Sequence, residues 1–296
     1  MKKICFIISI VLIFLPSCIG AFQLSATTEK GKVTICSQYR NISPGEVVKI
    51  SLQSPRFSSA GVHFHGENYM FVPDSSNSSF FLLIGLGLNM KPGIYELAIH
   101  IIFPDGSRRD FPLALPVSNG KFTIQNINVD EKYVFPSAKA QERIKKEFEL
   151  VKKVYQAYVP DWLGQGNFIV PSYGRIRKNF GEKRMFNNKL HSRHRGVDIR
   201  SSRGAKVKAA NSGKIVLKRN LYYAGNTVII DHGAGLFSIY CHLSRVSVKE
   251  GDLVNKGEVI GQVGSTGRVT GPHLHWGIKL YDQFVNPFSV LQISFN

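Results

Sequence analysis

The stretch TGPHLHWG, residues 270–277, places two histidines one residue apart. Because side chains alternate between the two faces of a β-strand, His273 and His275 are predicted to project from the same face of a sheet. Leu274 and Trp276 alternate with them, as the packed face of that strand should, and the Gly-Pro pair before them prevents a helix. Two imidazoles that converge on one side of a sheet make half of a metal site.

Two upstream clusters can complete such a site. The stretch HRGVD, residues 194–198, offers an imidazole at His194 and a carboxylate at Asp198, on a loop that enters a strand. His242 lies in an apolar run, IYCHL, that is predicted to be a strand. Two histidines and one aspartate are a common catalytic zinc set with an open position for water, and two further histidines then remain for acid–base work.

These residues resemble a known signature. His194-x-x-x-Asp198 followed by His273-x-His275 is similar to the motif of the lysostaphin/LytM-type zinc metallopeptidases, enzymes that cut peptide cross-links in bacterial cell walls. The resemblance covers roughly residues 168–290. It includes three further segments in the family's order and spacing: VIIDHG at 228–233, YCHLS at 240–244 and GSTG at 264–267.

The resemblance implies a role for each of the five site residues. By the family's pattern, His194, Asp198 and His275 bind one Zn²⁺ ion, which lowers the pKa of a bound water toward about 7 and polarises the scissile carbonyl. His242 and His273 stay beside the metal. One of them takes the proton of the water and passes it to the leaving amine, and the other stabilises the oxyanion. The sequence leaves open which does which.

Three more residues are close enough in the sequence to support the site. His191 and His232 are expected to be structural, or to orient a ligand, rather than to bind the metal. Tyr240 is two residues before His242 and is predicted to share its face, so it either donates to the oxyanion or packs. The same alternation turns the side chain of Cys241 away from the site.

Residues 161–296 are predicted to form the metallopeptidase domain, an antiparallel β-sheet with an active-site groove, as the resemblance implies. Arg184, Asn187 and Asn188 are expected on a loop before the first ligand, either at the substrate or in solvent. Cys36 and Cys241 fall in different predicted domains and are expected to be unpaired, buried thiols. Glycines punctuate the expected strands, which are 206–210, 213–218, 226–231, 236–242, 258–263 and 273–280.

Two other functions remain open for this domain. A non-catalytic protein of the same fold would bind the wall or activate a partner hydrolase, but the chain keeps all three ligand positions and both auxiliary histidines, which favours an enzyme. An adhesin with structural zinc would need a fourth protein ligand, and none is evident. The sequence does not name the peptide bond that is cut or the oligomeric state.

The composition supports a folded protein with an anionic partner. The chain has 296 residues, 43% of them hydrophobic, which favours two domains and argues against disorder. Its net charge is +18, and residues 160–296 alone hold 20 basic and 8 acidic residues. Such a charge suits an anionic polymer such as cell wall, or else a well-solvated surface. No nucleic-acid-binding motif is present, so nucleic acid is not an expected partner.

The amino terminus predicts export to the periplasm or cell envelope. A basic start followed by an apolar run over residues 4–15 is typical of a signal peptide, here residues 1–20. The stretch LPSC at residues 15–18 resembles a lipoprotein processing site, which would leave Cys18 acylated as a membrane anchor. The alternative is ordinary cleavage near Ala21, which discards that cysteine.

Residues 22–130 are predicted to be a β-sandwich-like accessory domain. Its short apolar runs alternate with turn residues, among them Pro-Asp-Gly at 104–106. His63 and His65 repeat the H-x-H pattern, but no Asp, Glu or Cys ligand lies near them in a recognisable pattern, so we expect surface histidines around a buried Phe64. We expect a spacer, a substrate-positioning module or an occluding module. The strands are expected at 47–52, 80–84, 95–103 and 111–117.

Residues 131–160 are predicted to be a linker helix, capped by Ser137 and ending before Pro160. An apolar stripe follows helical spacing along it. If the stripe packs on the metallopeptidase domain, the first domain could lie across the groove. If the helix folds back on the β-sandwich, the first domain is only a spacer that sets how far the metallopeptidase domain reaches. The stripe consists of Ile144, Phe148, Val151 and Tyr155.

Overall fold

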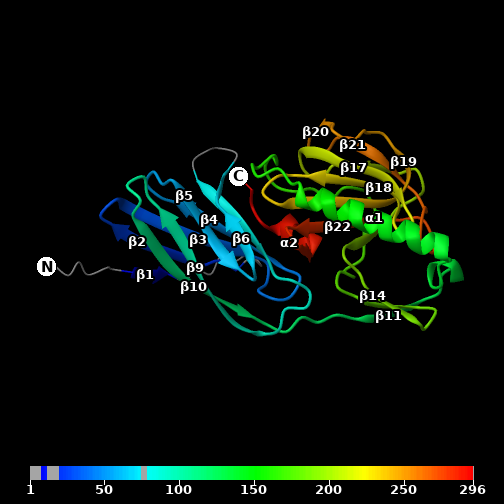
Figure 1. Cartoon of the computed structure of the whole chain (residues 1–296), viewed down its shortest axis with the longest axis horizontal. Helices are drawn as coiled ribbons and strands as arrows, with labels where there is room; N and C mark the ends of the chain where they lie inside the picture. The colour runs from blue at the N-terminus through cyan, green and yellow to red at the C-terminus, as the bar shows by residue number, and fades with distance from the viewer. Residues whose placement is uncertain (1–7, 12–19, 75–78, 296) are drawn as a thin grey trace.

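The computed structural model describes residues 8–11, 20–74 and 79–295, with the side chains of residues 8–11, 190 and 191 left out. Two β-rich units lie side by side, with helix α1 (Ala138–Gln156) across the second (Figure 1). The predicted signal peptide falls almost entirely outside the described residues, as do Cys5 and Cys18. Among the described residues, no helix combines the length and apolarity that a membrane span requires.

The first unit is a β-sandwich, as predicted. Over the described residues its two antiparallel sheets have the orders β1-β2-β3-β4-β8-β7 and β10-β9-β5-β6. Buried side chains from both sheets form one core, which includes Ile50, Leu82 and Ile99. The strands are β1 (Ile8–Val11), β2 (Gln23–Thr28), β3 (Gly31–Tyr39), β4 (Val47–Gln53), β5 (Ser59–Phe64), β6 (Glu67–Met70), β7 (Val72–Pro73), β8 (Phe80–Gly85), β9 (Gly93–Ile102) and β10 (Arg108–Val117).

The predicted turn and the predicted surface histidines of this unit are both confirmed. The Pro-Asp-Gly turn joins β9 to β10, with Gly106 at φ 78°, a conformation that favours glycine. Phe64 is buried between exposed His63 and His65, so this H-x-H pair is a surface feature around a core residue. His63 Nδ1 is hydrogen-bonded to Asn68 Oδ1, 2.8 Å away.

The second unit is built on a large antiparallel sheet. In the described part of the chain its strands follow the order β12-β15-β22-β19-β18-β17-β20, with β16, β21 and β23 attached beside this path. A short helix, α2 (Pro287–Gln292), closes the chain against it. The strands are β12 (Arg175–Ile176), β15 (Val197–Arg200), β16 (Lys206–Lys208), β17 (Gly213–Leu221), β18 (Gly225–Asp231), β19 (Leu236–Val246), β20 (Leu253–Val254), β21 (Val259–Val263), β22 (Leu274–Leu280) and β23 (Gln283–Val285).

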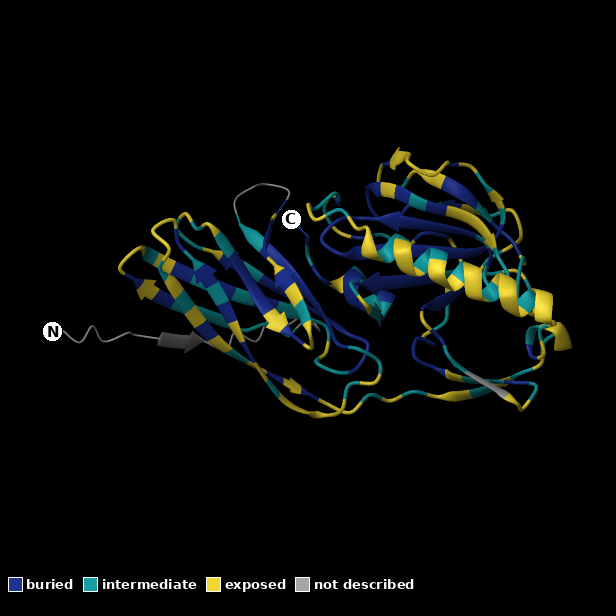
Figure 2. Ribbon diagram, viewed as in Figure 1, coloured by how far each residue is buried: buried dark blue, intermediate teal, exposed yellow. Residues whose placement is uncertain are grey.

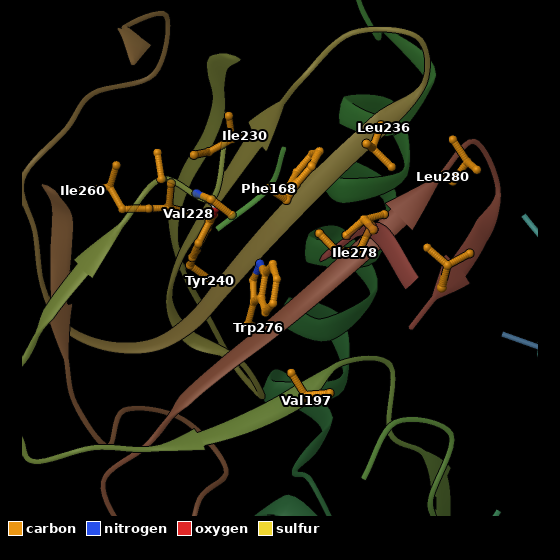
Figure 3. Packing of buried hydrophobic residues seen from close by; sticks show 14 of the residues in the cluster. Phe168, Val197, Val228, Ile230, Leu236, Tyr240, Ile260, Trp276, Ile278 and Leu280 are labelled. Atoms are coloured by element: carbon orange, nitrogen blue, oxygen red, sulfur yellow. Dashed lines mark hydrogen bonds between the residues drawn. The ribbon is translucent and has the colours of Figure 1, made fainter. Parts of the chain in front are cut away.

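One face of this sheet packs into the core, and the other carries the predicted site residues. On one face, Leu274, Trp276 and Ile278 of β22 point into the main core together with Tyr240 of β19 (Figure 3). Because neighbours alternate, His275 lies on the opposite face, as predicted from the sequence. Its partners directly across the sheet are Asp198 on β15 and Cys241 on β19. Opposite residues share a face, so these three side chains start on the same side of the sheet.

Helix α1 covers the other half of that opposite face. Ser137 caps its amino end, with its hydroxyl accepting a hydrogen bond from the Ala140 N–H. The helix packs on Leu217, Ile229, Phe237, Ile239 and Cys241 through Leu150, Val151, Val154 and Tyr155. The stripe therefore docks on the second unit and does not fold back on the sandwich. Its outward side is exposed along its length (Figure 2).

The predicted stripe was only partly right, because Val151 and Tyr155 are in the contact but Ile144 and Phe148 are not among the residues that pack on this cluster. Phe148 is 64% exposed, whereas Leu150 and Val154, which the prediction left out, are in the contact. The face that packs is thus rotated from the one read from the sequence. We expect Val154→Asp to lower the free energy of unfolding by about 2 kcal/mol, because it places a charge against an apolar sheet.

Phe148→Asp is the matched control, since it puts the same charge on the same helix at an exposed position. It should change the free energy of unfolding by less than about 0.5 kcal/mol. Urea unfolding of the full chain, followed by circular dichroism, measures both. Equal losses in the two variants would show that the helix packs by a different face.

A third, small sheet connects the units. Its strand order is β11-β13-β14, from β11 (Ile124–Ile127), β13 (Lys183–Phe186) and β14 (Leu190–Arg193), and it lies apart from the large sheet (Figure 1). Residues 22–130 were predicted to form the first domain. Strand β11 lies within that range but pairs in parallel with β13 of the second unit. The short 3₁₀ helix η1 (Glu131–Tyr133) follows and leads into α1. The segment after β10 therefore belongs structurally to the second unit.

The sandwich rests on the second unit at the carboxyl-terminal end of the chain. Phe81 packs edge-on against Trp162, and the Val47 N–H donates to Ser289 Oγ over 2.9 Å. Lys49 donates to the carbonyl of Ser294, between the rings of Phe81 and Phe295. Burial lowers the pKa of Lys49 to about 8. The contact is therefore a packed interface.

Candidate metal centre

The side chains of the three predicted metal ligands converge in the structure. The His194 Nε2, Asp198 Oδ1 and His275 Nδ1 atoms belong to a group in which each ligand atom lies within 4.8 Å of the others. His194 Nε2 is 3.0 Å and His275 Nδ1 is 3.3 Å from Asp198 Oδ1. The two imidazole nitrogens are 2.9 Å apart. Two imidazoles and a carboxylate that converge in this way are a donor set suited to a divalent metal ion.

The chain brings these groups together through strand pairing. Asp198 on β15 lies directly opposite His275 on β22, and His194 begins the loop that leads from β14 to β15. Gly196 in this loop has no room for a side chain. A Cβ there would lie 2.5 Å from the Trp276 carbonyl oxygen and 2.8 Å from His275 Nε2. The glycine thus lets the loop pass close over the His275 ring.

Backbone carbonyls fix which nitrogen each imidazole offers. The Nδ1 atoms of His194, His242 and His273 lie 2.9, 2.8 and 2.9 Å from the carbonyl oxygens of Asn179, Thr266 and Gly271. A carbonyl only accepts, so each Nδ1 carries the proton and each Nε2 is left unprotonated. An unprotonated Nε2 can bind a metal ion or accept a proton.

Asp198 is held in place by two residues on its outer side. Asn179 Nδ2 donates to Asp198 Oδ2 over 2.9 Å, and Arg184 Nη2 donates to the same oxygen over 2.6 Å. Asn179 Oδ1 also accepts from the Asp198 backbone N–H. The Oδ1 atom is thereby left to face His194 and His275. Burial alone would raise the pKa of Asp198, but the adjacent imidazoles of His194 and His275 hold it far below its usual range.

His242 and His273 lie beside the cluster. Their ring centroids are 4.9 Å apart, and His242 is 6.0 Å from His275 by the same measure. His273 Nε2 is 3.6 Å from Asp198 Oδ1, farther than the two converging histidines. Burial lowers the pKa of both, and for His242 the neighbouring His273 and His275 lower it further. Both are therefore neutral near pH 7 and able to accept a proton.

His242 reaches the site because β19 does not alternate regularly there. Between the pairs Val228↔Tyr240 and Asn226↔Leu243, β19 has one residue more than β18, which is a β-bulge. His242 takes φ 64°, the left-handed region that non-glycine residues rarely adopt. This local conformation turns its ring to the side of His275.

The bulge overturns two expectations. Tyr240 and His242 were predicted to share a face, but Tyr240 points into the core on the opposite side (Figure 3). Its hydroxyl accepts from the Ala210 N–H and is bonded to Ser238, so it is a packing residue without access to substrate. Cys241 was predicted to face away and instead shares the face of His275, buried and unpaired. Burial raises the pKa of its thiol to about 12.

The remaining predicted residues lie farther from the cluster. His232 is fully buried, bonded through Nδ1 to the Ser212 carbonyl and through Nε2 to Ser238 Oγ, so its role is structural. Burial lowers its pKa to about 4. The His191 backbone pairs with Met185 in the small sheet, and its side chain lies outside the described part. Cys36 is unpaired and half-buried rather than fully buried.

Arg184 and Asn187 do not serve as a mobile substrate loop. Arg184 lies on β13 and holds Asp198, while the Asn187 side chain exchanges two hydrogen bonds with the backbone of Val129. Asn187 and Asn188 form the turn from β13 to β14, at φ 49° and 58°. Asn179 was missed entirely, because a buried asparagine carries no sequence signal of its own.

An open groove of about 1310 Å³ surrounds the cluster. One wall comes from the small sheet and the segment after it, through Gln125, Ile127 and Val129. Among the described residues, none of the sandwich strands contributes a lining residue. The first unit therefore does not cover the groove. The basic side chains along it are Arg177, Arg184, Arg193, Arg195, Arg200 and Arg268.

Residues 192–287, which hold all five site residues, match peptidase family M23. The chain carries an M23 peptidase domain. This confirms the family resemblance and the mainly β, antiparallel fold expected from the sequence.

The curated relatives match only part of this chain. The peptidoglycan DD-endopeptidase ShyA of Vibrio cholerae is 42% identical over 120 residues, which are 40% of this chain and 28% of that protein. The DD-carboxypeptidase/endopeptidase Mpg of Neisseria meningitidis is 44% identical over 120 residues, 40% of this chain and 27% of that protein. The similarity thus spans less than a third of either relative.

One solved structure is similar over both units. The crystal structure of a putative peptidase M23 from Pseudomonas aeruginosa has 25% sequence identity and a TM-score of 0.66. The match covers 85% of this chain and 96% of that one. The arrangement of sandwich, connecting segment and M23 domain is therefore shared with that protein.

Proposed function

We propose that this chain is a zinc-dependent endopeptidase that hydrolyses peptide cross-links of bacterial peptidoglycan. The observation that carries the proposal is the convergence of His194, Asp198 and His275 in an open groove, with His242 and His273 beside them. The names of the curated relatives, DD-endopeptidase and DD-carboxypeptidase/endopeptidase, support this substrate class.

In this proposal the three converging residues would hold one Zn²⁺ ion. Once bound, it would act as a Lewis acid toward the scissile carbonyl and lower the pKa of a water. Two nitrogens and one carboxylate oxygen leave a position open, because a closed structural site would need a fourth protein ligand. Asn179 and Arg184 both donate to Asp198 Oδ2 and so orient the carboxylate with Oδ1 toward the two histidines.

His242 and His273 would move the protons. Each holds its Nδ1 proton on a backbone carbonyl and presents an unprotonated Nε2, so each can accept a proton from the attacking water. The imidazolium formed can then donate to the leaving amine or to the oxyanion. Either histidine is placed to accept the proton of the water, and the other can then donate to the leaving amine or to the oxyanion.

We also propose that the protein acts in the cell envelope. The basic start and apolar run over residues 1–20 support export, and a net charge of +18 suits an anionic wall. Whether Cys18 carries a lipid anchor follows from the mature amino terminus. A chain that begins at an acylated Cys18 supports anchoring, and one that begins near Ala21 excludes it.

Mass spectrometry of purified peptidoglycan after digestion with the full chain tests the function. An endopeptidase converts cross-linked peptide dimers into monomers and leaves the glycan intact. Loss of only a terminal residue would indicate a carboxypeptidase instead. Binding to the wall without any new fragment, at full zinc occupancy, would favour a non-catalytic wall-binding or hydrolase-activating protein.

A further inference from the structure

Arg268 occupies an unusual position in the groove. It follows β21 and lies with its guanidinium carbon 3.9 Å from the centroid of the Phe186 ring and 4.5 Å from that of Tyr223. Among the side chains that the structure describes, no carboxylate lies within ion-pair distance of it and none forms a hydrogen bond with its guanidinium. Two aromatic rings pack against this cation, and no described carboxylate pairs with it.

The contrast with Arg184 shows what is missing. Arg184 lines the same groove and pairs with Glu182 and Asp198. A cation removed from water is normally paired, because desolvation otherwise disfavours its charge. For Arg268, burial and the nearby Arg184 lower the pKa, and the aromatic rings offset only part of that cost. The planar guanidinium is left free to bind a carboxylate from outside the chain.

The backbone around Arg268 is fixed relative to the site histidines. The carbonyl of Thr266, two residues before, accepts from His242 Nδ1, and the Arg268 N–H donates to the Tyr223 carbonyl. The carbonyl of Gly267 accepts from the Tyr133 hydroxyl over 2.9 Å. A ligand bound by Arg268 would therefore lie at a set distance from the His242 side of the cluster.

The small sheet that supplies Phe186 also carries a buried acceptor without a partner among the described residues. Gln125 of β11 lies beside Arg184 in the parallel pairing of the small sheet, and Ile127 lies beside Phe186. The Gln125 Oε1 atom is buried and has no hydrogen-bond partner among the described residues. An amide acceptor and a free cation on the same groove match the N–H groups and the carboxylate of a peptide.

We propose that Arg268 binds a free carboxylate of the substrate peptide next to the scissile bond. The inference rests on the proposed function and specifies its substrate. In a direct cross-link that joins two residues of D configuration, the carbon that bears the amine of the scissile amide bond also carries a free carboxylate. In a bridge of glycines, the corresponding carbon carries no free carboxylate. Arg268 thus selects direct cross-links over glycine bridges, because an uncharged substrate leaves the cation unpaired.

Two synthetic cross-linked peptides test this, one with the free carboxylate and one with a carboxamide in its place. The zinc-loaded full chain should cut the carboxylate peptide with a kcat/KM roughly 10- to 100-fold higher. Arg268→Gln should remove that preference and leave cleavage of the carboxamide peptide within about threefold. Arg268→Lys should restore part of the preference. Arg245→Gln, an exposed arginine outside the groove, is the matched control and should change neither rate.

Equal losses on both peptides in Arg268→Gln would overturn the proposal and assign the residue a purely structural role. No loss on either would also overturn it. Binding of fluorescently labelled versions of the two peptides separates this proposal from the proposed function. If the chain cuts neither peptide but binds the carboxylate form more tightly through Arg268, the endopeptidase function fails and the Arg268 assignment stands.

Discussion

Replacing His275 with alanine is expected to abolish both metal binding and cleavage of cross-linked peptides. His275 supplies one of the three donor atoms that converge within 4.8 Å, and a site with two remaining donors holds a divalent ion poorly. His194→Ala should behave alike. Elemental analysis of the purified variants, together with the cleavage rate on a soluble peptide, measures both effects.

The chain offers a matched control for this experiment. His63 and His65 form a second H-x-H pair on the surface of the sandwich, and among the described residues they belong to no group of side chains that could hold a metal ion. His63→Ala should leave the metal content and the rate unchanged. A His275→Ala variant that keeps one metal ion per chain would contradict the ligand assignment.

Replacing His273 or His242 with alanine is expected to spare the metal and to reduce kcat by roughly 10²- to 10⁴-fold, the usual contribution of a general acid–base group. Both imidazoles lie beside the cluster, and both present an unprotonated Nε2 to the groove. The metal therefore keeps its three donors in either variant, while proton transfer loses a partner.

Metal content and single-turnover rates, measured on the same samples, check this division. Zinc lost from His273→Ala but retained in His275→Ala would reverse the roles of the two histidines in the H-x-H motif. The pH profile of the surviving activity shows which of His242 and His273 accepts the proton of the water, since removal of that residue abolishes the acidic limb.

The strand predictions succeeded where the residue pattern is local. Leu274 and Trp276 face the core and His275 the site, because β22 alternates without interruption. The same rule failed at Tyr240 and Cys241, where the extra residue of the bulge exchanges the faces. A bulge depends on the register with the neighbouring strand, which the sequence of β19 alone does not contain.

The long-range contacts could not be predicted. Asn179 forms hydrogen bonds with His194 and Asp198, but it lies in no recognisable motif. Arg184 was predicted to lie on a loop, because only the pairing of β13 with β14 shows that it is on a strand. The connecting strand β11 is short and was assigned to the first domain, because nothing local reveals a partner almost sixty residues away. Helix α1 was found, but its packing face was rotated because Phe148 fits a helical stripe equally well.

The most direct test of the central claim is a titration of the metal-free full chain with Zn²⁺. Bound metal and the rate of cross-link cleavage are measured in the same samples. A single site formed by His194, Asp198 and His275 predicts a rate that rises in proportion to bound zinc and levels off at one ion per chain. A rate that survives metal removal, or a chain with one bound zinc that cuts no peptide bond, would contradict it.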